Sequence, residues 1–145
     1  MIIYTIGFTK KTAEDFFSKI KKEGVEILID TRLNNRSQLS GFAKGSDLPY
    51  FLRNLSECEY SYEDCYAPTK EILDDYKNKR ISWSQYEEKY REMLHSRKAV
   101  EVFYEKYGKY KKVVLLCSEH DADFCHRRLL AEEIQNAYGY SVKHI

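Results

Sequence analysis

The chain has 145 residues, 43% of them hydrophobic, and its formal net charge is +1. This length predicts one domain over residues 1–145, with enough apolar surface to bury a core without disulfides. No apolar run approaches the roughly 18 residues of a membrane-spanning helix, so we expect no membrane contact. A net charge near zero also gives little support for nucleic-acid binding.

The first residues and the cysteines indicate the cellular compartment in which the protein is expected. Residues 1–6 form a short apolar segment that lacks the charged region and the cleavage site of a secretory signal peptide. We therefore expect a cytoplasmic protein whose cysteines are reduced. The four cysteines are Cys58, Cys65, Cys117 and Cys125.

The first thirty residues predict a strand, a helix and a second strand. Residues 2–6 form the first apolar run, and Thr12 is placed to cap a helix that Gly24 ends. The buried face of this helix is expected to hold Ala13, Phe16, Phe17 and Ile20. Residues 25–29 are the second strand. This order is typical of a βαβ unit, so the two strands should be parallel.

The middle of the chain predicts a long loop and then mostly helices. Residues 33–45 lack periodicity and are rich in Asn, Ser and Gly, as functional loops often are. A helix over about 47–55 and a strand over 59–62 should follow. Residues 68–109 are predicted to be a helical insertion.

Three helices are expected in that insertion, over about 68–79, from residue 82 onward, and over about 98–107. Ser82 and Gln85 match a capping box at the start of the second helix. Its buried stripe should hold Trp83, Tyr86, Tyr90, Met93 and Leu94.

The last part of the chain predicts a buried strand over 113–116, a helix that opens with Cys125 and ends at Gly139, and a closing strand over 140–144. Strands that alternate with helices predict an α/β protein. We expect three α/β/α layers around a small, mostly parallel sheet, with the helical insertion as an added lobe.

Three strands each lead into a polar turn. These turns are residues 7–9, 30–32 and 117–119. Because the carboxyl ends of parallel strands meet at one edge, the turns should lie side by side where ligands bind in α/β sheets. Gly7 belongs to the first of these turns and is a candidate ligand-binding residue.

Charge is unevenly distributed along the chain. Residues 31–53 hold four basic residues against one acid, whereas residues 54–93 hold ten acids and six bases. A local basic loop beside an acidic lobe favours a small anionic ligand, although two ordinary solvated faces would give the same pattern.

Two carboxylates are candidate catalytic groups. Glu119 follows a buried strand, where desolvation should raise the pKa of a carboxyl toward the range of a general acid or base. Asp30 is the second candidate, and its alternative is a structural ion pair with Arg32 or Arg127.

The start of the last helix supplies further candidates. Its helical phase directs Arg127 toward the strand ends and Arg128 toward solvent, so Arg127 could hold an anion together with Arg32. The alternative is that Arg127 pairs with Asp30 or Glu119. For His126 we favour a structural role over ligand binding.

Two cysteines in this region could bind a metal or act as nucleophiles. Zinc held by Cys117, Cys125, His120 and His126 is not expected, because the spacing matches no common zinc pattern. Cys117 or Cys125 as a nucleophile is an alternative, but Cys117 ends an apolar strand and should be buried and slow to alkylate. No glycine-rich nucleotide motif is present, and we expect no cofactor and no metal.

Several blocks resemble the family catalogued as domain of unknown function 488. They are residues 4–9, 28–32, 115–119, 125–127 and 142–145. The resemblance implies a cytosolic, mostly prokaryotic α/β domain, and it does not indicate which reaction, if any, the protein catalyses. The positions that are characteristic of the family fall, in this chain, on Gly7, Asp30, Arg32, Cys117, Glu119, Cys125, His126 and Arg127. The chain departs at residues 33–37, where many members carry a proline and a serine–arginine pair, and at 67–69, where many carry a leucine–glycine–glycine turn.

These observations favour an enzyme that acts on a phosphate-bearing or nucleotide-like ligand at the carboxyl edge of the sheet. Arg32 and Arg127 would hold the anion, and Glu119 would act as acid or base. Two alternatives stay open: a non-catalytic domain that binds a ligand or nucleic acid, and a thiol enzyme built on Cys117 or Cys125.

Overall fold

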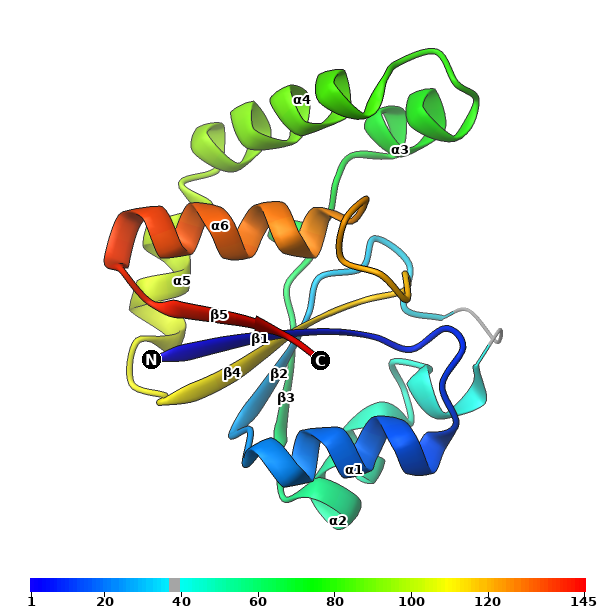
Figure 1. Ribbon diagram of the computed structural model, residues 1–145, viewed down its shortest axis with the longest axis vertical. Helices are drawn as coiled ribbons and strands as arrows, with labels where there is room; N and C mark the ends of the chain where they lie inside the picture. The colour runs from blue at the N-terminus through cyan, green and yellow to red at the C-terminus, as the bar shows by residue number, and fades with distance from the viewer. Residues whose placement is uncertain (37–39) are drawn as a thin grey trace.

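The computed structural model describes residues 1–36 and 40–145, and these contain a sheet of five parallel strands (Figure 1). The spatial order is β3-β2-β4-β1-β5. The strands are β1 (Ile2–Gly7), β2 (Ile27–Asp30), β3 (Glu59–Tyr62), β4 (Lys112–Cys117) and β5 (Ser141–His144). The predicted α/β class is confirmed, and the sheet is parallel throughout rather than mostly so.

The register aligns the carboxyl ends of the three central strands. Gly7 at the end of β1 pairs with Cys117 of β4, and Asp30 of β2 pairs with Leu116. The turns after these strands therefore lie side by side, as the sequence predicts. Residues 113–116 are completely buried because helices cover both faces of β4, which explains the unbroken apolar run.

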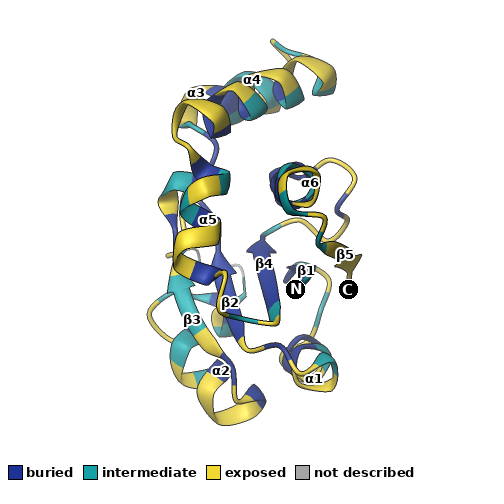
Figure 2. Ribbon diagram, turned by 90° about the vertical axis from the view of Figure 1, so that its left-hand side faces the viewer, coloured by how far each residue is buried: buried dark blue, intermediate teal, exposed yellow. Residues whose placement is uncertain are grey.

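Helices form a layer on each face of the sheet, as Figure 2 shows. On one face α1 (Ala13–Glu23) and α2 (Leu48–Ser56) pack against side chains such as Leu28 and Val114. On the other face α5 (Ala99–Tyr107) and α6 (His126–Tyr138) pack against Ile29 and Leu115. The helices α3 (Lys70–Lys77) and α4 (Trp83–Ser96) lie beyond α6.

Local signals place most helix ends correctly. The Thr12 hydroxyl accepts a hydrogen bond from the backbone N–H of Asp15, and Gly24 ends α1 with a φ of 66°. Ser82 and Gln85 form the predicted capping box of α4. These signals are reliable because they act within a few residues of chain.

Some local predictions need correction. Ala13 is exposed because it stands at the first position of α1, before the helix reaches the sheet. β2 begins at Ile27 rather than at residue 25, and α6 begins at His126 with Cys125 as its N-cap. In the predicted loop 33–45, residues 37–39 lie outside the described part, and residues 41–43 form a short 3₁₀ helix.

The segment predicted as a helical insertion contains α3, α4 and α5. A second 3₁₀ helix, residues 64–66, precedes it. Trp83 of the predicted buried stripe is only partly buried, whereas Tyr86, Tyr90, Met93 and Leu94 are buried as expected. In residues 1–36 and 40–145, no helix is both long enough and apolar enough to cross a membrane.

Candidate functional site

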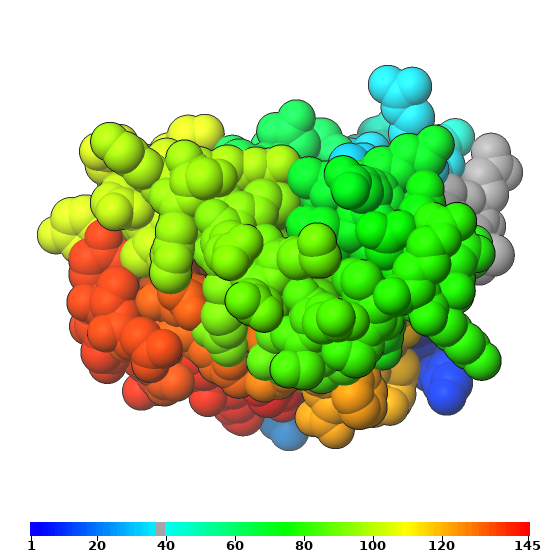
Figure 3. All heavy atoms as spheres, turned by 90° about the horizontal axis from the view of Figure 1, so that it is seen from above, coloured from blue at the N-terminus to red at the C-terminus, as the bar shows by residue number. Residues whose placement is uncertain are grey.

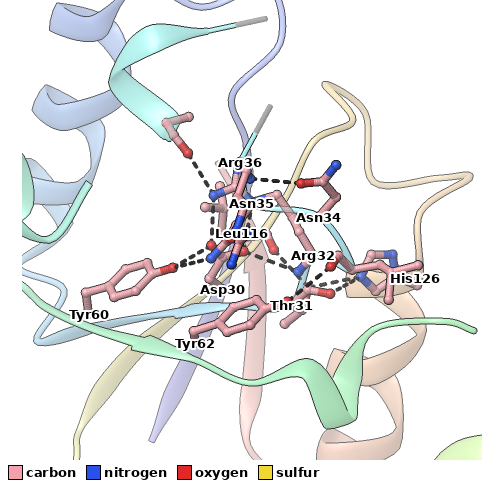
Figure 4. Close-up of polar contacts among 12 residues, drawn as sticks. Asp30, Thr31, Arg32, Asn34, Asn35, Arg36, Tyr60, Tyr62, Leu116 and His126 are labelled. Carbon is pink, nitrogen blue, oxygen red and sulfur yellow. Dashed lines mark hydrogen bonds and ion pairs between the residues drawn. The ribbon is translucent and has the colours of Figure 1, made fainter. Parts of the chain in front are cut away.

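The end of β2 holds a buried ion pair. Arg32 Nε and Nη2 donate to the two carboxylate oxygens of Asp30 at 2.8 and 2.7 Å, and both side chains are almost fully buried. The Tyr60 hydroxyl also donates to Asp30 Oδ2 at 2.7 Å (Figure 4). With both oxygens occupied, Asp30 holds Arg32 in place. The structural alternative therefore fits Asp30 better than the predicted catalytic role.

Thr31, between these two residues, fixes the orientation of His126. The Thr31 hydroxyl donates to the carbonyl oxygen of Leu116 at 2.8 Å. His126 Nε2 lies 3.0 Å from that hydroxyl oxygen and 2.9 Å from the Thr31 carbonyl oxygen (Figure 4). Because both neighbours of Nε2 must accept, this nitrogen carries the proton in the neutral ring. The lone pair is then on Nδ1.

That lone pair faces a thiol. His126 Nδ1 lies 3.6 Å from Cys117 Sγ. The neighbouring Cys125 thiol, within 4.8 Å, together with the charge of His126 holds the pKa of Cys117 well below its ordinary value, although burial opposes it. Burial lowers the pKa of His126, but the neighbouring Cys117 sulfur more than offsets this, so the pKa of His126 is raised.

Cys125 completes this group from the N-cap of α6. Its Sγ, Cys117 Sγ and a ring nitrogen of His126 all lie within 4.8 Å of one another, and all three residues are buried. Burial raises the pKa of Cys125 well above its ordinary value, and the neighbouring Cys117 sulfur acts in the same direction. The site therefore pairs a thiol that readily loses its proton with one that keeps it.

Arg127 points toward the strand ends as expected, but its partners differ from those predicted. Its guanidinium donates to the backbone carbonyl oxygens of Glu119 and His120, and Nη1 also lies 3.6 Å from Cys125 Sγ. The side chain is only 1% exposed. Because the loop after β4 folds back over the start of α6, its backbone carbonyls, and not a carboxylate, accept the hydrogen bonds of Arg127. The predicted pairing with Asp30 or the Glu119 side chain is therefore wrong.

Arg128 also differs from the prediction. Rather than being solvated, it forms ion pairs with Glu132 on its own helix and with Glu87 on α4. Its side chain is 22% exposed. This contact connects α4 to α6.

Gly7 allows two backbone segments to approach closely because it has no side chain. A Cβ added at Gly7 would lie 1.6 Å from the carbonyl oxygen of Glu119. The loop after β4 thus passes directly against the end of β1, and the Thr9 hydroxyl donates to the Ser118 carbonyl oxygen at 2.8 Å to hold it there. Gly7, predicted as a ligand-binding residue, contributes close packing of backbone.

A cavity of about 300 Å³ opens between the strand ends and the α3–α4 pair. Figure 3 views the molecule from the side of these helices, with the residues near 120, in orange, emerging beside them. One wall of the cavity is aromatic, formed by Tyr76, Trp83, Tyr86 and Phe124. The sequence analysis placed Trp83 and Tyr86 only in the buried stripe of α4, and no sequence signal showed that they also form a cavity wall.

Apart from the apolar residues Leu33, Pro68 and Leu73, the remaining lining is polar or chemically reactive. The group Cys117, Cys125 and His126 lines the cavity together with Arg32, Asn34, Ser118 and Glu119. Glu119 is exposed, which corrects the prediction of a desolvated carboxylate, because the chain leaves the sheet immediately after Cys117. Arg127 is not part of the lining, so the two arginines do not share this cavity as predicted.

Among the described residues, Cys117, Cys125 and His126 are also the group whose donor atoms could hold a metal ion. The sequence spacing gave no sign of this, because it does not reveal that the loop folds back. His120 is not in the group, and its ring is exposed beside Lys11. The Arg127 guanidinium, 3.6 Å from Cys125 Sγ, puts a positive charge where a cation would need thiolates. The arrangement thus suits thiolate chemistry better than cation binding.

Comparison with known proteins gives one result. Neither the curated proteins nor the solved structures contain a match to this chain. A family model matches residues 12–134, which include the strand ends of β2 and β4 and the start of α6. On the strength of that match the chain belongs to the family described as domain of unknown function DUF488.

Proposed function

We propose that this protein is a thiol enzyme in which Cys117 is the nucleophile and His126 its general base, acting on a small ligand in the aromatic cavity. The observation that carries the proposal is the 3.6 Å contact between Cys117 Sγ and His126 Nδ1, with Nε2 held by Thr31. A base oriented by a third group beside a nucleophile is the arrangement that activates thiols.

In the resting site the proton of Cys117 Sγ has passed to His126 Nδ1. The resulting thiolate lies at the amino end of α6, where unpaired backbone N–H groups and the helix dipole favour negative charge. Because the sulfur lines the cavity, a bound electrophile can reach it. Glu119, exposed on the cavity rim, is placed to exchange a proton with the leaving group.

The hypothesis of a phosphate-bearing or nucleotide-like ligand has weaker support. Arg32 lines the cavity, but its charge is balanced by Asp30, and Arg127, whose Nη1 and Nη2 donate to backbone carbonyls, is not part of the lining. A site for a phosphate group would need free donors directed into the cavity. We therefore expect the ligand to be recognised mainly by its apolar part.

The proposal is tested by mapping alkylation. Cys117 is buried as the sequence predicts, but the proposal reverses the expectation that it alkylates slowly. At pH 7 an ordinary thiol is only about 3% thiolate, so a fully ionised Cys117 should react with iodoacetamide roughly 30-fold faster than a reference thiol. Cys65 is the internal control, since it is more exposed than Cys117 but burial raises its pKa to about 11. Peptide mass mapping after short exposure gives both rates.

Two further measurements separate catalysis from simple reactivity. His126→Gln should slow the labelling of Cys117 at least tenfold while that of Cys65 stays unchanged. An activated aryl acetate should give a burst with an acetyl group on Cys117, which Cys117→Ser abolishes. If Cys117 reacts no faster than Cys65 in the wild-type protein, and no acetyl group is found on it, the proposal is wrong.

A further inference from the structure

Cys125 has no explained role in a site that consists only of Cys117 and His126. It is the N-cap residue of α6, yet its side chain makes no capping hydrogen bond. Ser, Thr, Asp and Asn are the residues that serve this position well. Its sulfur instead lies within 4.8 Å of the Cys117 sulfur, and both cysteines line the same cavity.

We infer that Cys125 is the resolving thiol for Cys117 and that the substrates of this protein are small disulfides with apolar or aromatic substituents. This inference rests on the proposed nucleophile. A Cys117–Cys125 disulfide needs the two sulfur atoms to approach from within 4.8 Å to about 2.05 Å. Changes of side-chain rotamer at the two cysteines can provide that approach.

In the first step the Cys117 thiolate attacks one sulfur of a substrate R–S–S–R′. The S–S bond of the substrate breaks and a new S–S bond joins Cys117 to R. The leaving thiolate R′S⁻ takes the proton that His126 Nδ1 had received from Cys117, so one thiol R′SH is released. His126 is then neutral again, with its lone pair free.

In the second step Cys125 gives its proton to His126 and attacks Cys117 Sγ. The mixed disulfide breaks, RS⁻ leaves with that proton, and a Cys117–Cys125 disulfide remains. The substrate has gained two electrons and two protons, and the protein has lost them. A second dithiol must reduce the protein disulfide to complete a cycle.

The surroundings of Cys125 favour this second step. While Cys117 is a thiolate, its charge disfavours ionisation of Cys125, but a mixed disulfide carries no charge. Arg127 Nη1, 3.6 Å from Cys125 Sγ, then faces a sulfur that is free to become a thiolate. A guanidinium beside a thiol favours its ionised form.

The cavity wall indicates which disulfides fit. Trp83 stacks on Tyr86 with ring centroids 4.7 Å apart, and Phe124 meets Trp83 edge-on at 5.4 Å. Sulfur makes favourable contacts with aromatic rings, and apolar substituents lose little solvation here. The balanced charge of Arg32 offers little to a charged substituent.

The experiment uses the reduced full-length protein and dithiodipyridine, a neutral aromatic disulfide that releases a coloured thione. The wild-type protein should release two thiones for each Cys117 that reacts, with a Cys117–Cys125 disulfide found by peptide mass mapping. Cys125→Ser should release one and keep a stable mixed disulfide on Cys117. The control Cys58→Ser should behave as wild type, because Cys58 is buried on the other face of the sheet.

The outcomes separate the inference from the proposed function. Rapid alkylation of Cys117 without any Cys117–Cys125 disulfide would overturn the inference and leave the nucleophile in place. Slow reaction of Cys117 with both reagents would overturn both. About one equivalent of zinc in the purified protein, with thiol labelling only after chelation, would show that the three side chains hold a metal and would also overturn both. Oxidised glutathione reacting faster than dithiodipyridine would contradict the stated substrate class.

Discussion

Replacement of Gly7 by alanine tests how closely the loop after β4 is packed against β1. The added Cβ would stand 1.6 Å from the Glu119 carbonyl oxygen, whereas real Cβ contacts stay beyond 3.0 Å. The carbonyl must therefore withdraw by roughly 1.4 Å or the end of β1 must shift by as much. Either movement separates Glu119 from Arg127, which donates to that same oxygen.

The size of the effect follows from these contacts. Overpacking of a well-filled site costs about 1–3 kcal/mol. Loss of a hydrogen bond from a buried charged group adds about 1.5–3 kcal/mol. We therefore expect Gly7→Ala to lower the free energy of unfolding by roughly 3–5 kcal/mol, a large part of the ~5–15 kcal/mol typical of a domain.

Urea unfolding followed by circular dichroism measures this change. Gly41→Ala is the matched control, because no atom of the described residues 1–36 and 40–145 lies within 4 Å of a Cβ at that position. It should change the free energy of unfolding by less than about 1 kcal/mol. If Gly7→Ala is no more destabilising than Gly41→Ala, the close approach of the loop to β1 is not real.

Three further predictions concern other parts of the molecule. Arg127→Met should lower the free energy of unfolding by roughly 3–5 kcal/mol, because it removes two buried charge-assisted hydrogen bonds. Arg128→Met should lower it by about 1 kcal/mol or less. Equal losses for the two variants in urea unfolding would contradict this prediction. Between pH 8 and pH 6 the alkylation rate of Cys117 should fall less steeply than that of Cys65, because the pKa of Cys117 is lowered whereas burial raises that of Cys65 to about 11. Equal slopes at the two cysteines would contradict the lowered pKa of Cys117. Thr12→Ala should cost about 1 kcal/mol in thermal or urea unfolding, and no measurable change would mean that the cap of α1 is unimportant.

The sequence predicted those parts of the fold that depend on neighbouring residues. Thr12, Ser82 and Gly24 mark helix ends through contacts within one turn, so their roles can be inferred without knowing the fold. The apolar run at 113–116 likewise indicates a strand buried on both faces. The position of β4 between β1 and β2 does not follow in this way, because it depends on pairings between distant segments.

The candidate site could be located but not assembled from the sequence. Helical phase correctly directed Arg127 toward the strand ends, but it could not show that backbone carbonyls would take its donors. The spacing of Cys117 and Cys125 matched no common zinc pattern, and it does not reveal that the loop between them folds back to bring the two thiols together. The tautomer of His126 depends on Thr31, which is distant in sequence and was not singled out.

The hydrogen bonds around His126 join Thr31 at the end of β2, Leu116 in β4 and the first turn of α6. None of these contacts can form on a ribosome until nearly the whole chain has been synthesised, since His126 lies 95 positions after Thr31 in a chain of 145 residues. A chain interrupted before α6 would carry Cys117 as an ordinary thiol, with no base beside it. The rate at which Cys117 is modified in a translation mixture therefore reports when the chain has completed folding.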